Sequence, residues 1–143
     1  MDANQQLLSL AYVVLPPSIL DWFEITKIED DYVPGVPGKD VYNGTLHIYL
    51  DEGDNRPSEI QGLSPNGFTE PTVVSDFPIR DRKVKLHIRR RRWLDEEGRN
   101  VLLCNYPLAA EGTRISEEFA AFLKEYDEHE ACYGHVYWYK LGC

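Results

Sequence analysis

The segment that decides the fold is Lys83-Val84-Lys85-Leu86-His87-Ile88-Arg89-Arg90-Arg91-Arg92-Trp93. Successive side chains of a β-strand point to opposite faces, so this alternation predicts a strand with Val84, Leu86 and Ile88 on a buried face. The other face is expected to carry Lys85, His87, Arg89 and Arg91, with Trp93 following on that side. Arg90 and Arg92 then fall on the apolar side and are expected to leave the core at the outer end of the strand.

Turn residues follow this strand directly. Asp95-Glu96-Glu97-Gly98 predicts a hairpin turn, because Gly98 can adopt a positive φ without a steric cost. Val101 to Cys104 is the expected return strand. A basic hairpin over about 83–104 is therefore placed at the centre of the predicted sheet.

Flanking segments predict a mixed set of helices and strands. Apolar spacing indicates an N-terminal helix over 4–15, with Asn4 as a possible cap and an apolar stripe of Leu7, Leu8, Leu10, Ala11 and Val14. Further helices are expected at 17–23 and 113–126, strands at 25–30, 45–50, 72–76 and 133–141, and long loops at 33–44 and 51–71. The chain is predicted to be α+β, a small antiparallel sheet flanked by short helices, with one domain over 1–126 and a C-terminal extension of unknown role over 127–143.

Charge is distributed unevenly along the 143 residues. The net charge is −9, but residues 80–99 hold nine basic and four acidic residues, a local balance of +5. The remainder holds six basic and twenty acidic residues, a balance of −14. This asymmetry indicates either a localised anionic partner or an internal match between the cations and the acidic body.

The basic strand is the candidate site. A ladder of cations on one strand face can meet several phosphates of a duplex, and arginine can read guanine in the major groove. The residues expected to contact nucleic acid are Lys83, Lys85, His87, Arg89, Arg90, Arg91, Arg92 and Trp93. His87 is expected to be neutral, because neighbouring cations disfavour its protonated form. The competing interpretation is that the arginines pair with Asp and Glu of the acidic body.

Other chemistry is poorly represented. No nucleophile elbow and no glycine-rich phosphate loop is found, and Asp51, Asp76 and Glu118 each have an ordinary structural explanation, so no catalytic residue and no cofactor is expected. Cys104, Cys132, His135 and Cys143 lack the paired spacing of a structural zinc site, and no metal is expected. No signal peptide or membrane helix is predicted, and the cysteines are interpreted as thiols of a cytoplasmic protein.

Five separated blocks resemble the N-terminal region of ISAon-type insertion-sequence transposases. They are Leu15 to Ile25, Leu46 to Glu52, Asp76 to Arg80, Val84 to Asp95, and a last block made of Glu111 to Ile115 and Glu118 to Lys124. The resemblance spans about 15–126 in the family's motif order. The arginine block is also similar to the zinc-ribbon head of ISL-type transposases, but Trp93 and Leu94 stand where that head has metal-binding cysteines, which implies a ribbon without metal.

The resemblance implies a non-catalytic role in transposition, with the terminal repeats of the element as the DNA partner. A separately encoded subunit with the DDE nuclease is the implied protein partner. The alternative is an acidic protein-interaction module that docks such a subunit, and a decayed remnant without activity is a third possibility. The sequence indicates neither the DNA sequence recognised nor the oligomeric state.

Overall fold

The computed structural model describes residues 2–34, 42–110 and 113–133. Its helices are α1 (Ala3–Val14), α2 (Ile19–Trp22) and α3 (Glu117–Tyr133). Its strands are β1 (Phe23–Asp30), β2 (Gly44–Glu52), β3 (Ser64–Phe68), β4 (Thr72–Ile79), β5 (Arg82–Arg89), β6 (Arg91–Leu94) and β7 (Asn100–Val101). The fold class is α+β, as predicted. The strand expected at 133–141 lies almost wholly outside the described residues.

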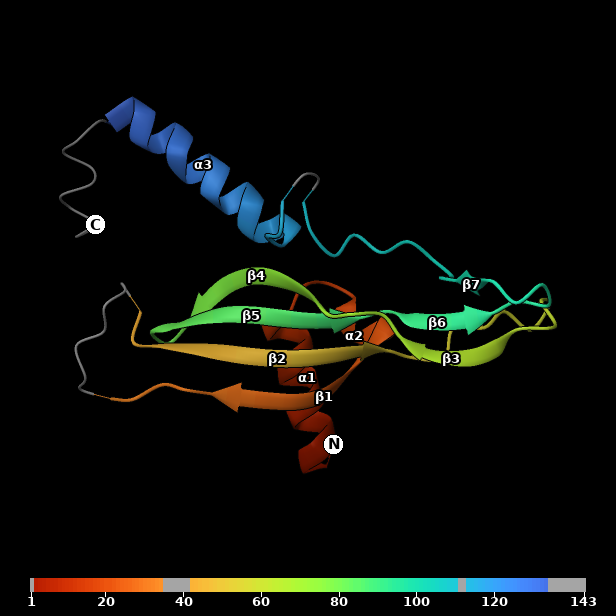
Figure 1. The fold of residues 1–143 in the computed structure, drawn as a ribbon. Coiled ribbons are helices and arrows are strands. Elements are labelled where there is room, and N and C mark those ends of the chain that lie inside the picture. Colours follow the sequence, from red (N-terminus) through yellow and green to blue (C-terminus); the bar gives the residue numbers. More distant parts are fainter. Residues whose placement is uncertain (1, 35–41, 111–112, 134–143) are drawn as a thin grey trace.

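Two sheets lie end to end (Figure 1). The larger has the strand order β1-β2-β5-β4 and the smaller the order β3-β6-β7. β5 pairs parallel with β2 and antiparallel with β4, so the larger sheet is mixed where an antiparallel one was predicted. The chain leaves the larger sheet at the end of β5 and enters the smaller as β6.

The prediction that residues 83–104 form one central hairpin is wrong, because β5 does not pair with the strand that follows the turn. Both neighbours of β5 come from earlier in the chain, whereas β7 pairs only with β6. The turn itself is where the sequence placed it: Gly98 N–H donates to Asp95 O at 3.1 Å, and Gly98 has φ +78°. The hairpin is therefore a short β6–β7 unit at the far end of the smaller sheet.

The core covers one face of the larger sheet. Val84, Leu86 and Ile88 of β5 are each at most 1% exposed, which confirms the buried side of the predicted alternation. They pack with Ile48 and Leu50 of β2 and Val74 of β4. Leu15, Ile19 and Phe23, from the chain between α1 and the start of β1, complete the cluster. Tyr106, Leu108 and Ala109 lie against the same cluster. The opposite face of the sheet, here called the outer face, carries polar and charged side chains together with Tyr49 and Val73.

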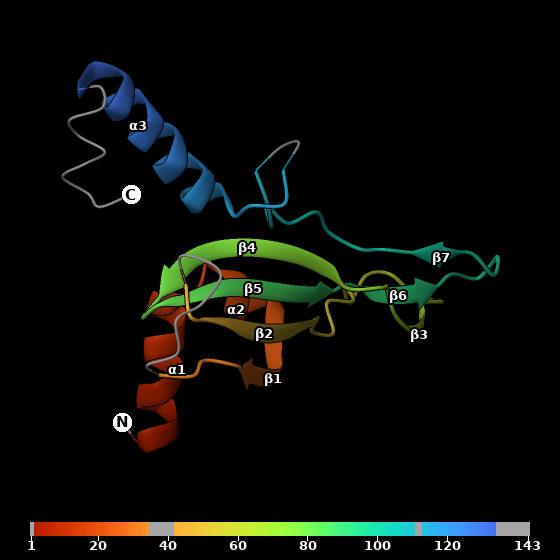
Figure 2. The same ribbon diagram turned by 60° about the vertical axis from the view of Figure 1, so that its left-hand side comes forward.

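Helix α1 differs from its expected packing. Asp2 caps it in a capping box with Gln5, where Asn4 was the expected cap. None of its residues is buried, and Leu7 and Leu10 are 64% and 59% exposed. The predicted apolar stripe thus does not face the core, and Figures 1 and 2 show the N-terminal end of α1 pointing away from the sheets.

Helix α3 packs against β4 through aromatic side chains. The ring of Phe77 lies 5.1 Å from that of Phe119 and 5.6 Å from that of Phe122. Before the helix, Ser116 N–H donates to Ser75 O, and the Ser116 hydroxyl donates to Asp76 Oδ1 at 2.7 Å. Ser116 thus ties the helix start to the sheet edge. Among the described helices, none combines the length and apolar character needed to cross a membrane.

Candidate nucleic-acid interface

The outer face of the larger sheet carries the basic side of β5. Lys83, Lys85, His87 and Arg89 alternate with the buried residues of this strand and are all half-buried. Their neighbours across β2 are, in order, Thr45, His47, Tyr49 and Asp51. The structure therefore brings four of the eight candidate residues together on one surface.

Lys85 is the best-placed cation of this face. Its ammonium donates to the hydroxyl of Ser75 on β4 at 2.6 Å. Because this partner is neutral, the bond orients the side chain without cancelling its charge. Lys83 and Lys85 also line one hollow of about 190 Å³, together with Tyr42 and Phe119. The same hollow is also lined by Asp76, whose carboxylate accepts from the Ser116 hydroxyl.

His87 belongs to an aromatic row on the outer face. Its Nε2 lies 2.8 Å from Nδ1 of His47, and its ring stacks on Tyr49 with centroids 4.4 Å apart and planes 14° apart. Burial lowers the pKa of His87, as do the nearby His47 and Lys85, while Glu29 acts in the opposite direction. The neutral form is favoured, as the sequence predicts, and the imidazole can offer a ring face and a hydrogen bond.

Arg89 is on the expected face but is already paired. Its guanidinium makes two bonds with the carboxylate of Asp51, Nε to Oδ1 at 2.7 Å and Nη2 to Oδ2 at 2.5 Å. It also lies 4.6 Å from the centroid of the Phe68 ring. Since its side chain is 43% exposed, Arg89 still reaches the surface. Its charge there is largely offset by Asp51.

The prediction that Arg90 leaves the core at the outer end of the strand is wrong. Its Nε lies 2.9 Å from Oε1 of Glu52, whose side chain is fully buried, and its Nη2 donates to the carbonyl of Cys104 at 2.6 Å. The guanidinium also lies over the ring of Tyr106. Arg90 therefore joins the end of β2 to the segment that follows β7.

Arg91 and Arg92 are also held by the protein. Arg91 N–H donates to Glu52 Oε1 at 2.8 Å, and its Nε donates to the Glu52 carbonyl at 3.2 Å. Arg92 Nε donates to the carbonyl of Asn66 at 3.1 Å. Both side chains are half-buried, and Arg91 lies 4.9 Å from the Phe68 ring centroid. The projected finger of four arginines is replaced by an anchored junction between the two sheets.

The prediction that Trp93 contacts nucleic acid is also wrong, because its side chain is enclosed by the protein. Its exposed fraction is 0%, and its Nε1–H donates to Asn55 Oδ1 at 3.2 Å. The guanidinium of Arg56 lies 4.7 Å from the indole centroid. A side chain enclosed in this way cannot stack on a nucleotide base, so its role is in the packing of the smaller sheet.

Sequence reasoning missed the partners of β5 on the outer face. Tyr49 stacks on His87, and the ammonium of Lys27 lies 5.4 Å from the Tyr49 ring centroid. A hollow of about 260 Å³ opens beside this row, lined by Thr26, Lys27, Tyr49, Asp51, Pro71, His87 and Arg89. The alternation of residues 45–50 already separated His47 and Tyr49 from the apolar side. What it did not reveal was that β2 lies next to β5.

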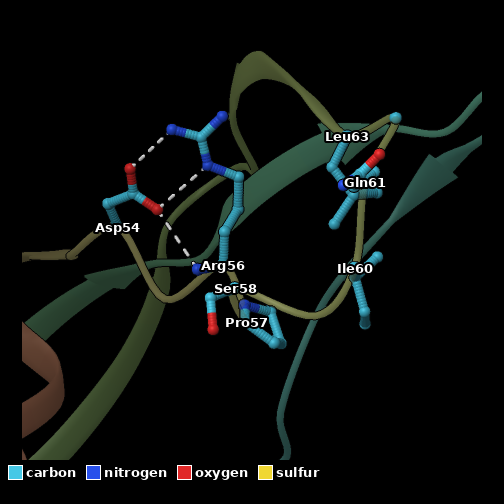
Figure 3. A pocket seen from close by; sticks show the side chains of 8 residues that line it. Asp54, Arg56, Pro57, Ser58, Ile60, Gln61 and Leu63 are labelled. Atoms are coloured by element: carbon cyan, nitrogen blue, oxygen red, sulfur yellow. Dashed lines mark hydrogen bonds and ion pairs between the residues drawn. The ribbon is translucent and has the colours of Figure 1, made fainter.

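A larger hollow of about 690 Å³ lies within the loop that follows β2 (Figure 3). One continuous stretch lines it, from Asp54 to Leu63. Arg56 is its cation, and Asp54 already accepts from the backbone N–H, Nε and Nη2 of Arg56. Because the charge is satisfied locally and only one segment contributes, this hollow is a weaker candidate than the outer face.

Metal ligands do not converge in the described part of the chain, where no group of three or more His, Cys, Asp or Glu side chains is placed to hold an ion. Cys104 is an exposed thiol. The side chain of Cys132, together with His135 and Cys143, lies outside the described residues. Asp51 and Asp76 are occupied by Arg89 and Ser116, respectively.

Comparison with known proteins yields no relative: no family model matches the sequence, and neither a curated protein nor a solved structure matches the chain.

Proposed function

We propose that this chain is a non-catalytic DNA-docking region of an insertion-sequence transposase, and that it contacts DNA with the outer face of its larger sheet. The observation that carries the proposal is the direction of the β5 side chains: Lys83, Lys85 and His87 leave the sheet on the side opposite to the core. The five motif blocks that resemble the transposase N-terminal region support the assignment to transposition.

The contact surface differs from the arginine tip that the sequence suggested. Lys85 retains a charge held by a neutral partner, and Tyr49 and His87 offer an aromatic row beside it. Ammonium groups supply phosphate contacts, and ring faces supply stacking or van der Waals contact with sugar and base. Arg90 joins the two sheets through Glu52, whereas Arg92 and Trp93 contribute to the packing of the smaller sheet.

The test is fluorescence anisotropy with a labelled duplex of the element's terminal repeats and a scrambled duplex as competitor. Wild-type affinity should fall log-linearly with salt, because each neutralised phosphate releases counterions. Lys85→Gln should weaken binding several-fold and lower the salt slope by about one. Lys124→Gln, which removes an exposed cation from α3, is the matched control and should bind like the wild type.

Two results would contradict the proposal. One is a wild-type protein that does not bind the terminal repeats at low salt. The other is a Lys85→Gln variant whose affinity and salt slope equal those of the Lys124→Gln control. If the protein binds both duplexes equally well and Lys85→Gln still weakens binding, the outer face is the DNA contact. Sequence recognition would then belong to another subunit.

A protein-interaction module is the second candidate. The observation in its favour is that Asp51 and Glu52 offset Arg89 and Arg90, which leaves the acidic remainder of the chain dominant. Such a body would dock a basic partner, for which the product of the neighbouring reading frame is the natural choice. Co-purification of the two products, in a complex that survives loss of Lys85, would favour this alternative.

A further inference from the structure

Helix α1 carries a large uncharged apolar surface. Six of its side chains are more than two-fifths exposed: Leu7, Leu8, Leu10, Tyr12, Val13 and Val14. The whole helix, Ala3–Val14, contains no Asp, Glu, Lys or Arg, in a chain of net charge −9. Contiguous apolar patches of this kind mark interaction surfaces, because leaving them in water is unfavourable.

The orientation of α1 leaves one of its sides available. The Tyr12 hydroxyl donates to Asp21 Oδ1 at 3.0 Å, which fixes that side of the helix toward α2. At about 3.6 residues per turn, Leu7, Leu10 and Val14 project from roughly the opposite side. Together with Ala3 they have the 4-3-4 spacing of a coiled-coil seam.

We propose that α1 is a self-association surface, and that its partner is α1 of a second copy of this chain in antiparallel orientation. Charge is the argument for this occupant. A seam without charged groups needs an equally uncharged partner surface, and an identical helix supplies one with matching spacing. In a two-fold arrangement, Leu7 of one chain meets Leu10 of the other, and Ala3 meets Val14.

The negative charge of the two chains favours the antiparallel orientation of the paired α1 helices. Two chains of −9 repel each other, and a parallel pairing would bring both bodies to the same end of the helices. An antiparallel pairing places them at opposite ends, separated by about 18 Å of helix at a rise of 1.5 Å per residue. That distance exceeds the Debye length of about 8 Å at physiological ionic strength, so the repulsion is screened. The views in Figures 1 and 2 agree that α1 leads away from the sheets.

Sedimentation equilibrium of the full chain over a wide concentration range tests the proposal. The wild-type weight-average mass should rise from one chain toward two, and more steeply at physiological than at very low ionic strength, because only at low ionic strength does the Debye length of about 30 Å exceed the separation of the two acidic chains. This salt response is opposite to that of DNA binding, so failure of one proposal is distinguishable from failure of the other.

A matched pair of variants locates the surface. Leu10→Glu buries a charge in the seam and should keep the chain monomeric throughout. Ser9→Glu adds the same charge to the adjacent residue on the far side of the helix and should dimerise like the wild type. Circular dichroism checks that both variants retain their helices.

Disulfide trapping tests the orientation. With the native cysteines replaced by serine, an Ala3→Cys chain and a Val14→Cys chain should cross-link to each other in preference to themselves. A wild type that stays monomeric at all concentrations overturns the proposal, as does a Leu10→Glu variant that still dimerises. Preferential cross-linking of Ala3→Cys chains to one another, and of Val14→Cys chains to one another, would overturn the antiparallel arrangement. Saturable binding of vesicles or of another protein by a monomeric chain would overturn self-association and assign the surface to that partner.

Discussion

Arg90 Nε lies 2.9 Å from Oε1 of Glu52, and the Glu52 side chain has no exposed surface. The same carboxylate accepts from Arg91 N–H and from Asn55 Nδ2, each at 2.8 Å. A buried carboxylate is tolerated only when opposite charge and hydrogen bonds replace its hydration. This cluster joins the larger sheet to the smaller one, and it holds Arg90 and Arg91, two of the eight residues that the sequence assigned to nucleic-acid contact.

Arg90→Ala should lower the free energy of unfolding by about 3–5 kcal/mol, because it leaves the Glu52 charge buried without its partner. Urea denaturation monitored by circular dichroism measures the change. Arg99→Ala is the comparison, since Arg99 pairs with Asp95 and Glu97 on an exposed turn and is 70% exposed. Its loss should change stability by less than about 0.5 kcal/mol. Equal effects of the two substitutions would show that the buried pair is not a structural clamp.

Trp93→Phe should destabilise the chain by about 1–3 kcal/mol, because Asn55 Oδ1 loses its donor and the smaller ring leaves a gap. The fraction of the tryptophan emission that iodide does not quench should also be smaller in the variant than in the wild type. Adding DNA to the wild type should leave that shielded emission unchanged. Strong quenching of it by DNA would contradict the buried position of this side chain.

Asp51→Asn should strengthen DNA binding, because it removes the carboxylate that offsets Arg89 on the outer face. We expect up to about a tenfold gain in affinity, corresponding to ~1.4 kcal/mol. The anisotropy titration used for Lys85 provides the measurement. The double variant Asp51→Asn/Arg89→Gln should lose the gain. A persistent gain in the double variant would mean that Asp51 acts by general repulsion of phosphate.

Acidification below about pH 6.5 should destabilise the fold through His87. Its pKa is lowered by burial, by His47 and by Lys85, so in this window the unfolded chain binds more protons than the folded one. The contribution is complete above the ordinary histidine pKa and declines as the pH falls through the folded value. Urea midpoints at pH 7.5 and pH 5.5 measure it, and His87→Gln should reduce the difference. Greater wild-type stability at pH 5.5 would reverse the predicted sign.

The two-residue turn between β4 and β5 should accept glycine with a gain in stability. Arg80 and Asp81 have φ values of +47° and +66°, a region that costs a residue with a Cβ about 1–2 kcal/mol. Asp81→Gly removes that cost but loosens the unfolded chain, so we expect a net gain of about 0.5–1 kcal/mol. The thermal midpoint should rise. Asp81→Ala provides the contrast, because it keeps the Cβ and should not stabilise.

Local pattern predicted much of the fold. The alternation of Val84, Leu86 and Ile88 located β5 and its buried side, and turn chemistry located Gly98. Strand pairing was not accessible in this way, because the neighbours of β5 are selected by contacts distant in sequence. β3 also went unrecognised, since Ser64–Phe68 contains proline and glycine and forms a strand only where β6 provides a partner.

The candidate site was predictable only up to Arg89. Beyond it the chain passes into the smaller sheet, where Arg90 meets Thr69 and the packed side changes. Trp93 therefore faces the interior, although an uninterrupted strand would have placed it on the side of Arg89. Arg90 lies on the side of Ile88 in such a strand, but it stays there because Glu52 pairs with it, where the sequence analysis expected it to leave the core. The sequence contains the acidic partners, but nothing in Asp51-Glu52 alone indicates which arginines they will reach.

The parallel contact between β2 and β5 has a consequence for biosynthesis. Gly44 is aligned with Arg82 and Asp51 with Arg89, so the central pair of the larger sheet closes only after the whole of β5 has left the ribosome. Until then β2 can pair only with β1, and the unpaired backbone groups along its other edge are open to other chains. Truncated products of this reading frame that stop before β5 are therefore expected to aggregate and be degraded, which leaves only chains with an intact basic strand to accumulate.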